Sequence, residues 1–230
     1  MAGTTTSIFF QASDPLKLTG WKAQTGGAPT DTEQNQVALG EDGDKIAERG
    51  YDKKSAISVS YVAVLSNAVI PPAGDIVQGW HIDSVTVNWV NNDWAKMTVA
   101  AHKHGSADHD ATRKYEPTIG KVGGWGCPTS LGPFTLGANS GCGVRSVSYT
   151  LQANHVDEPN EVGEHLAGNN YDGTEQLTVE TTGPFDFAAG SDGWHLDSAG
   201  KSKTNTGATT SSATYTKHLA HKTEGTSPSA

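Results

Sequence analysis

The sequence predicts a mainly β protein of two fused, duplicated antiparallel modules, sandwich-like or barrel-like, with long Gly-rich loops and little helix. Three observations predict this fold class. A six-residue motif occurs twice, at residues 79–84 and 193–198, with five of the six residues identical. Several segments alternate apolar and polar residues with the two-residue period of a β-strand. Many of the 27 glycines lie between those segments, where turns and loops are expected.

The similarity between the two copies extends upstream of the motif. The first Tyr-Asp pair is followed by a second one 120 positions later, whereas the two Trp motifs lie 114 positions apart. The two offsets differ by 120 − 114 = 6 positions, and a difference of this size is typical of a loop insertion. The pattern predicts an internal duplication. The residues that mark the repeat are Tyr51, Asp52, Trp80, His81, Asp83, Tyr171, Asp172, Trp194, His195 and Asp197.

We divide the chain into five segments. Residues 1–20 form an N-terminal arm, and residues 21–104 form the first β repeat. A long Gly/Pro-rich loop occupies residues 105–143 and, because structureless loops of this length are uncommon, is expected to contact something. Residues 144–222 form the second β repeat, and residues 223–230 form a flexible tail.

Strands of the first repeat follow from its apolar alternation. A short strand is expected around residues 16–21, a polar Gly-rich loop at 24–44, one helical turn at 44–49 and a strand buried on both faces at 57–65. In the next strand the apolar face changes between Ile82 and Val85, which predicts a β-bulge near Asp83 and Ser84. Residues 94–102 return as the second arm of a hairpin.

The second repeat shows the same kind of alternation. Val147, Tyr149 and Leu151 are predicted to share the inner face of a strand at residues 144–153, and Leu177 and Val179 the inner face of another. Two strands poorer in aliphatic residues are expected at 194–203 and 209–219.

Charge and hydropathy exclude some classes of partner. The formal net charge of −9 argues against a nucleic-acid-binding groove, which needs Lys and Arg to neutralise phosphates. No signal peptide is recognisable at residues 1–10, and no apolar run is long enough to span a membrane. Cys127 and Cys142 could pair if oxidised, but two cysteines do not make a disulfide framework, and free thiols are favoured.

Three closely spaced histidines are candidates for metal binding. His102, His104 and His109 lie near Asp108 and Asp110, and a His-x-His pair can ligate a metal. The spacing matches no metal signature, so a solvated hairpin end is the favoured interpretation. No metal and no cofactor are predicted.

The repeated His-x-Asp pairs were weighed as acid-base groups. His81 with Asp83, and His195 with Asp197, each point to one face of a strand. Occurrence in both copies favours a structural hydrogen bond, so no catalytic residue is assigned and the protein is not predicted to be an enzyme. Five of the six tryptophans could form a sugar-stacking surface, although alternating positions favour core packing. They are Trp80, Trp89, Trp94, Trp125 and Trp194.

Residues 147–180 resemble phage tail-tube and related tail structural proteins. The likeness lies in the strand at 147–151, the polar loop at 157–167, the sequence Tyr171-Asp172-Gly173 and the strand at 177–180. The resemblance implies a β-sandwich or barrel that assembles into stacked rings, with inner sheets lining a DNA channel.

The expected function is therefore that of a virion structural protein made in the host cytoplasm. Its partners would be copies of itself and other virion tail proteins. DNA would be only non-specific cargo in a lumen whose acidic charge keeps the DNA from binding to it. The alternatives are a carbohydrate-binding β module, a capsid decoration protein and a head-tail connector protein.

Overall fold

The computed structural model describes residues 14–65, 67–104, 113–122, 124–128, 130–131, 133–135, 143–159, 165–183, 185, 187, 189–203 and 209–219. Within these ranges the secondary structure consists of strands, bridges and turns, so the predicted mainly β, antiparallel fold with little helix is confirmed. These ranges contain no helix that could cross a membrane. Most of the expected N-terminal arm, the expected tail, Cys142, His109, Asp108 and Asp110 lie outside the described residues.

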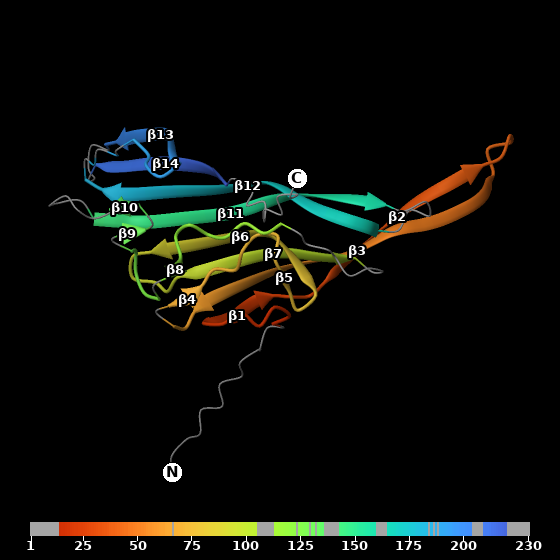
Figure 1. Cartoon of the computed structure of the whole chain (residues 1–230), viewed down its shortest axis with the longest axis horizontal. Helices are drawn as coiled ribbons and strands as arrows, with labels where there is room; N and C mark the ends of the chain where they lie inside the picture. The colour runs from red at the N-terminus through yellow and green to blue at the C-terminus, as the bar shows by residue number, and fades with distance from the viewer. Residues whose placement is uncertain are drawn as a thin grey trace, which may run out of the picture.

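One antiparallel sheet of ten strands dominates the molecule (Figure 1). The strand order is β1-β3-β7-β6-β11-β12-β14-β13, with β2 paired to β3 and β5 paired to β6. The strands of this sheet are β1 (Trp21–Gly26), β2 (Thr30–Leu39), β3 (Lys45–Ala63), β5 (Ile76–Val77), β6 (Trp80–Val90), β7 (Lys96–His104), β11 (Gly143–Pro159), β12 (His165–Thr182), β13 (His195–Ser202) and β14 (Thr210–Leu219).

Two small strand pairs accompany the large sheet. They are β4 (Ala68–Val69) with β8 (Lys121–Val122), and β9 (Ser130–Leu131) with β10 (Phe134–Thr135). Part of the expected Gly/Pro-rich loop thus forms short strands. Residues from these segments, among them Ile70, Tyr115 and Val122, belong to the same buried cluster as the inward side chains of the large sheet. They therefore cover its apolar face.

Apolar alternation explains the central strands. Along β6, Val85, Val87 and Trp89 are buried while the residues between them are not, because successive side chains point to opposite faces. The expected inner faces of the strands at residues 144–153 and 177–179 are confirmed in the same way. Strand β3 departs from expectation: between Ile57 and Ala63 alternate residues are buried, so one face is in the core rather than two.

Strands of both predicted repeats belong to this one sheet. Strand β6 of the first lies beside β11 of the second, with Val87 opposite Tyr149 and Trp89 opposite Val147. A single hydrophobic cluster contains buried residues from both. The large core therefore crosses the boundary between the two expected modules.

The strand order on each side of this seam follows the same scheme. The sequence β2/β1-β3-β7-β6 on one side corresponds to β11-β12-β14-β13 on the other. The β6–β7 ladder shifts register between Ile82 and Ser84, which confirms the predicted bulge. The β13–β14 ladder shifts between Leu196 and Ser198, 114 positions later.

The hairpins on the two sides also carry irregularities at corresponding places. The β2–β3 ladder shifts between Thr32 and Gln34. The β11–β12 ladder shifts between Gln152 and Asn154, 120 positions later. Because a bulge bends a strand and increases its local twist, each of these positions sets the direction of its hairpin.

Strands β2 and β3 continue beyond the sheet as a projecting two-stranded arm (Figure 1). All ten residues of β2 are exposed. The loop expected at residues 24–44 and the helical turn expected at 44–49 are wrong, since these residues form the end of β1, all of β2, the turn after it and the start of β3. Exposure of β2 on both faces removes the apolar alternation by which a strand is recognised in a sequence. Gly43, at φ 81°, lies in the turn at the tip.

Candidate functional site

Three neighbouring strands each carry two chemically active side chains spaced two residues apart. Because alternate residues of a strand share a face, each pair points to the same side of the sheet. The pairs meet where the β6–β11 ladder ends, at Ser84 and Gln152. The six residues of this His-Asp cluster are His81 and Asp83 on β6, His102 and His104 on β7, and His155 and Asp157 on β11.

The imidazoles of the cluster are deeply buried and in mutual contact. His81 is 1%, His102 2% and His104 7% exposed. The ring centroid of His81 lies 4.7 Å from that of His102 and 4.4 Å from that of His155. Burial of several polar rings is unfavourable unless their nitrogens are satisfied. The cluster is therefore held together by polar contacts rather than by apolar packing alone.

Asp83 anchors one side of the cluster. Its Oδ1 lies 2.6 Å from His102 Nδ1 and 3.5 Å from His81 Nδ1. Burial alone would raise the pKa of Asp83, but hydrogen bonds and positive charge from His102 and His81 outweigh it and lower the pKa to about 2. Burial lowers the pKa of His102 more than Asp83 raises it. At neutral pH the pair is therefore a carboxylate facing a neutral imidazole.

Asp157 anchors the other side. Its Oδ1 lies 2.7 Å from His155 Nε2 and 3.1 Å from His104 Nε2, and its Oδ2 lies 3.3 Å from Lys54 Nζ. Burial opposes the ionised carboxylate, yet the hydrogen bond from His155 and the charge of Lys54 lower its pKa below the usual range. For His155, the bonds to Asp157 and Asn170 outweigh burial and raise the pKa.

Asn170 fixes the orientation of His155. Its side chain is fully buried, and its Nδ2 donates to the carbonyl oxygens of Gly74 at 3.2 Å and Arg113 at 2.6 Å. With both amide hydrogens directed at carbonyls, Asn170 Oδ1 is left to accept a hydrogen bond from His155 Nδ1 at 2.8 Å. A Cβ at Gly74 would lie 2.5 Å from both Asn170 Nδ2 and Arg113 O, so only glycine fits there.

Such a group of imidazoles and carboxylates can share protons or hold a metal ion. The ligand atoms fall into two sets, each set lying within 4.8 Å. One set is His102, His104, His155 and Asp157, and the other is His81, Asp83 and His102. The expectation that His102 and His104 form a solvated hairpin end is wrong, because pairing of β7 with β3 and β6 buries both.

The structure places the two His-x-Asp motifs in different surroundings. His81 is buried in the cluster, whereas His195 is exposed on β13. The aspartates behave alike, since Asp83 faces His102 and Asp197 accepts a hydrogen bond from Thr216 on the adjacent strand. The structural hydrogen bond expected of both motifs is therefore made by the bulged aspartate, with a partner across the strand pair.

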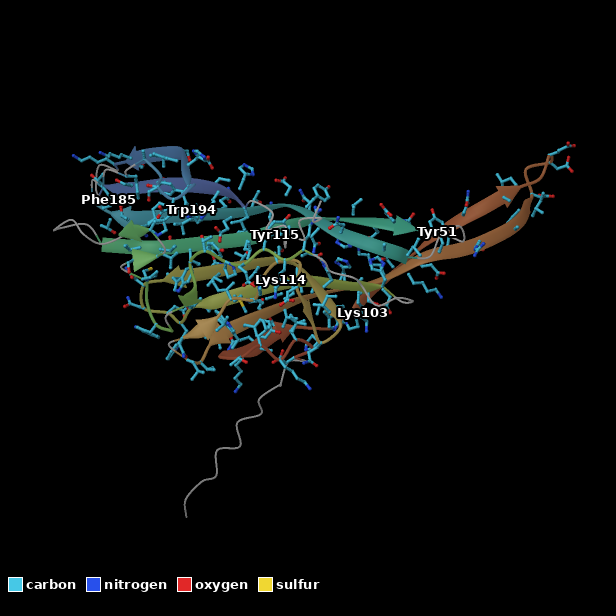
Figure 2. The ribbon with its side chains drawn as sticks, viewed as in Figure 1. Tyr51, Lys103, Lys114, Tyr115, Phe185 and Trp194 are labelled. Carbon is cyan, nitrogen blue, oxygen red and sulfur yellow. The ribbon has the colours of Figure 1, made fainter. Side chains whose placement is uncertain are left out.

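The remaining repeat markers are spread over β3, β6, β12 and the residue before β13. Trp80 and Trp194 are both buried, and each ring has a lysine ammonium above it, Lys103 at 4.8 Å and Lys217 at 6.0 Å. Tyr51 and Asp52 lie in β3, and Figure 2 shows Tyr51 on the arm, at the other end of the molecule from Trp194.

Tyr171 and Asp172, the later pair of repeat markers, lie on the surface of β12. Tyr171 is 47% exposed, and Asp172 Oδ1 lies 3.6 Å from His218 Nδ1. The His-Asp cluster lies where β6, β7 and β11 meet, so its six residues come from other strands than β3 and β12, which carry the two Tyr-Asp pairs.

Two residues of the cluster were missed from the sequence. His155 and Asp157 form a third His-x-Asp pair, with the same spacing as His81 and Asp83. That shared spacing was the available signal, although residues 155 and 157 lie beyond the strand expected at 144–153. What the sequence does not give is the packing of β11 against β6 and β7.

Of the five tryptophans considered for a sugar-stacking surface, two are exposed. Trp80, Trp89 and Trp194 are in the core, while Trp94 and Trp125 are 46% and 60% exposed. The latter two pack edge to face at 5.5 Å. Core packing is thus the use of most of these side chains, as alternation favoured.

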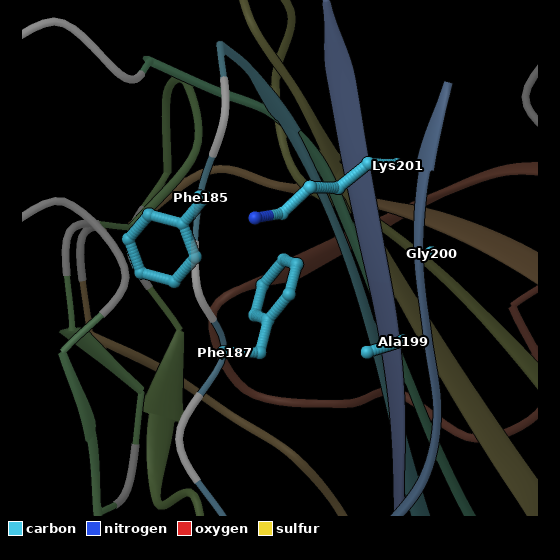
Figure 3. Close-up of a pocket in the computed structure, with 5 residues that line it drawn as sticks. All are labelled: Phe185, Phe187, Ala199, Gly200 and Lys201. Carbon is cyan, nitrogen blue, oxygen red and sulfur yellow. The ribbon is translucent and has the colours of Figure 1, made fainter.

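A hollow of about 300 Å³ lies beside β13, at the edge of the sheet. Figure 3 shows the rings of Phe185 and Phe187 and the side chain of Lys201 facing this space, with Ala199 and Gly200 on the strand. Cys127, a free thiol, donates to the carbonyl oxygen of Arg145 at 3.3 Å. Neither feature adjoins the His-Asp cluster.

No protein-family model and no curated protein matches the chain.

Proposed function

We propose that this chain is a non-enzymatic virion structural protein, a phage tail-tube subunit that self-assembles into stacked rings around a DNA channel. The observation that carries the proposal is the projecting β2–β3 arm. Among the described strands, β2 pairs with β3 alone, and every residue of β2 is exposed. An isolated two-stranded ribbon is marginally stable in water, so an arm of this length needs a surface to rest on.

The arm carries apolar side chains where a solvated ribbon would be polar. Val37 is 45%, Leu39 63% and Ile46 71% exposed, and all three lie near its tip. Exposed apolar groups gathered on a protruding element are typical of an interaction surface. We assign a second copy of this chain as the occupant, because an arm that reaches beyond its own sheet can bridge neighbouring subunits.

The edges of the sheet support the same assignment. Strand β13 is an edge strand with most residues exposed, and strand edges are templates for pairing with another chain. The β11–β12 hairpin also exposes Val156 and Leu166 near its tip, at 48% and 65%. An open sheet with two apolar hairpin ends can contact neighbouring subunits on more than one side.

The proposal includes an internal duplication of the β module. Its support is the agreement between sequence offsets and sheet registers: in each half the bulged strand pair carries the Trp motif, and the hairpin bulges lie 120 positions apart. Two similar modules in one subunit would present two similar hairpins to a ring. The net charge of −9 suits a lumen that lets DNA slide.

Assembly of the purified protein tests the proposal. We expect the wild type to form rings or tubes visible by negative-stain electron microscopy and large species by light scattering. The double variant Leu39→Asp/Ile46→Asp should remain monomeric, because charge at the tip disfavours apolar contact. Its melting temperature should stay near that of the wild type, since neither residue is in the core.

The matched control is Gln36→Glu, which adds negative charge to an exposed polar position of the same strand. This variant should assemble as the wild type does. A wild-type protein that stays monomeric at high concentration would refute the proposal. Assembly of the double variant to the wild-type extent would show that the arm is not the contact.

A further inference from the structure

We propose that the His-Asp cluster is a binding site for one divalent transition-metal ion of the zinc class. The ligands are His102, His104, His155 and Asp157, from strands β7 and β11. The site is independent of the proposed assembly, because all four donors come from one chain.

Hydrogen bonds at Nδ1 select the ligating nitrogen of two of the three imidazoles. His102 Nδ1 donates a hydrogen bond to Asp83 Oδ1 at 2.6 Å. Nε2 is therefore the nitrogen of that ring that would bind the metal ion. His155 Nδ1 donates to Asn170 Oδ1 at 2.8 Å, so Nε2 is the nitrogen that would bind the ion, in exchange for the proton that it otherwise shares with Asp157 Oδ1 at 2.7 Å. Ligating histidines usually give their second ring N–H to a carboxylate or a carbonyl oxygen in this way, and such partners fix the tautomer and the ring orientation.

The fourth ligand is equally well oriented. Asp157 Oδ2 is occupied by Lys54 at 3.3 Å, so Oδ1 is the oxygen directed at His104 Nε2 and His155 Nε2. All four ligand atoms lie within 4.8 Å of one another. Bonds of the usual length in a tetrahedral zinc site place neighbouring ligand atoms about 3.4 Å apart. Side-chain rotations that move each ligand atom by about an ångström or less therefore suffice to form the site.

The donor set decides the class of ion. Three imidazole nitrogens and one carboxylate oxygen suit Zn²⁺ and its neighbours, whereas Ca²⁺ and Mg²⁺ require mostly oxygen ligands. Burial of the rings also argues against a surface group that collects ions without specificity.

The other half of the sheet shows that the fold does not require this cluster. In the β13–β14 pair the positions corresponding to His81, His102 and His104 hold His195, Thr216 and His218. His195 is exposed, and the side chain of His218 is 71% exposed. The same bulged strand pair thus exists without buried imidazoles, which points to a specific role for those at β6, β7 and β11.

The metal would join strands that do not pair with each other. Strand β11 is separated from β7 by β6, and the β6–β11 ladder ends at Ser84 and Gln152. Beyond that point β11 continues as one strand of the second hairpin. An ion held by β7 and β11 would fasten the base of this hairpin to the sheet.

Metal binding to the full chain, with any affinity tag removed, tests the proposal. After treatment with EDTA and dialysis, titration calorimetry should give one Zn²⁺ per chain, and Co²⁺ should give the intense visible absorption of a tetrahedral site. Zn²⁺ should raise the melting temperature, and Mg²⁺ should not. The variants His104→Gln and Asp157→Asn should bind Zn²⁺ about 100-fold more weakly or not at all.

The control variants are His195→Gln and His218→Gln, which remove exposed histidines of the corresponding strand pair and should bind as the wild type does. Asp83→Asn, which alters the hydrogen-bond partner of His102 and keeps all four ligands, should weaken binding about 10-fold to 100-fold. Circular dichroism of the metal-free proteins checks that each variant is folded.

Two outcomes would overturn the assignment. One is a folded wild type that binds neither Zn²⁺ nor Co²⁺ stoichiometrically. The other is loss of binding in His81→Gln together with full binding in His104→Gln, which would place the ion at His81, Asp83 and His102 instead.

Discussion

Glu175 is a fully buried carboxylate whose oxygens are satisfied by three donors. Its Oε1 accepts from Thr118 N at 2.6 Å and from the Tyr149 hydroxyl at 2.5 Å, and its Oε2 accepts from Thr118 Oγ1 at 2.6 Å. Thr118 belongs to the segment that covers the sheet, while Tyr149 and Glu175 lie on β11 and β12. A buried charge with hydrogen bonds of this quality tolerates its burial and fixes the covering segment.

Replacement of Tyr149 by Phe should destabilise the protein in a pH-dependent manner. At pH 7 we expect a loss of about 1.5–3 kcal/mol, since a hydrogen bond to a charged group is removed. Burial, together with the charge and hydrogen bond of Glu175, raises the pKa of Tyr149. The stability that comes from this raised pKa is present below the pKa of about 10 in the unfolded chain and is lost as pH rises.

The difference in unfolding free energy between wild type and Tyr149→Phe should therefore shrink by about 1.4 kcal/mol from pH 7 to pH 11. Urea unfolding at both pH values measures it. A difference that stays constant would mean that the tyrosine ionises equally in the folded and unfolded chains.

The inward position of Tyr149 was predicted from alternation, but its partner was not. Glu175 stands in line with Leu177 and Val179, so the same rule places it on the inner face. A carboxyl group is tolerated at this buried position because Thr118 donates a hydrogen bond to it. Thr118 lies 57 positions away in a segment without periodicity. Alternation indicates which side chains point inward, whereas the pairing of polar groups depends on tertiary packing.

At the scale of elements, a tight turn starts β6 within the repeated motif. Gln78 and Gly79 have φ of 53° and 77°, and Asp192 and Gly193 before β13 have φ of 54° and 84°. Positive φ at both central residues is the pattern of a type I′ turn, which favours Asn or Asp followed by Gly. The glycine of the motif is therefore a requirement of the backbone at that point.

Gly79→Ala should lower the free energy of unfolding by about 1 kcal/mol, because alanine disfavours the left-handed region. No atom lies within 4 Å of an added Cβ, so backbone strain accounts for the whole effect. Gly79→Asn should lower it less, because asparagine tolerates positive φ. Chemical denaturation of the three proteins gives the comparison, and equal losses for Ala and Asn would show that the turn does not impose this strain.

Strands with one buried face were predicted, as was the mostly exposed β13, whereas β2, which is exposed along its whole length, was missed. The strands expected at 144–153, 194–203 and 209–219 correspond to β11, β13 and β14, and the bulge at Asp83 was also found. Strand β2 was assigned to a loop because it has no inner face. A stretch such as Lys45–Glu48 reads as a helical turn in isolation, and pairing with residues 37–39 makes it a strand.

The His-Asp cluster was partly visible in the sequence. The pairs at 81 and 83, at 102 and 104 and at 155 and 157 each stand in the sequence, but nothing local links one pair to another. Each pair alone matches no metal signature. Their meeting depends on the strand order β7-β6-β11, which joins the two predicted repeats and has no local signal.

At the scale of the whole molecule, sequence offsets of 114 and 120 positions reappear as registers of the sheet. Ile57 faces Ala101 and Val59 faces Val99 across β3–β7, while Leu177 faces Tyr215 and Val179 faces Ala213 across β12–β14. Residues related by these offsets occupy equivalent positions in the two strand pairs, because the register of a strand pair determines which side chains enter the core. The sequence did not indicate that both halves would share one sheet.

The arm and the body of the sheet should be separable in stability and in assembly. Asn35 and Gly50 are paired across the β2–β3 ladder. Replacement of residues 36–49 by Asn-Gly should therefore close a two-residue hairpin at that pair. The removed segment contributes no residue to the hydrophobic core, so the melting temperature of the shortened protein should stay close to that of the wild type.

Assembly should respond differently, because the shortened protein lacks Val37, Leu39 and Ile46. We expect a monomer by light scattering and no rings or tubes by electron microscopy, at concentrations where the full chain assembles. Because the His-Asp cluster stays intact, the shortened protein should still bind one Zn²⁺ per chain. Rings formed without the arm would place the subunit contact at the sheet edges, whereas a large fall in melting temperature would show that the arm stabilises the single chain.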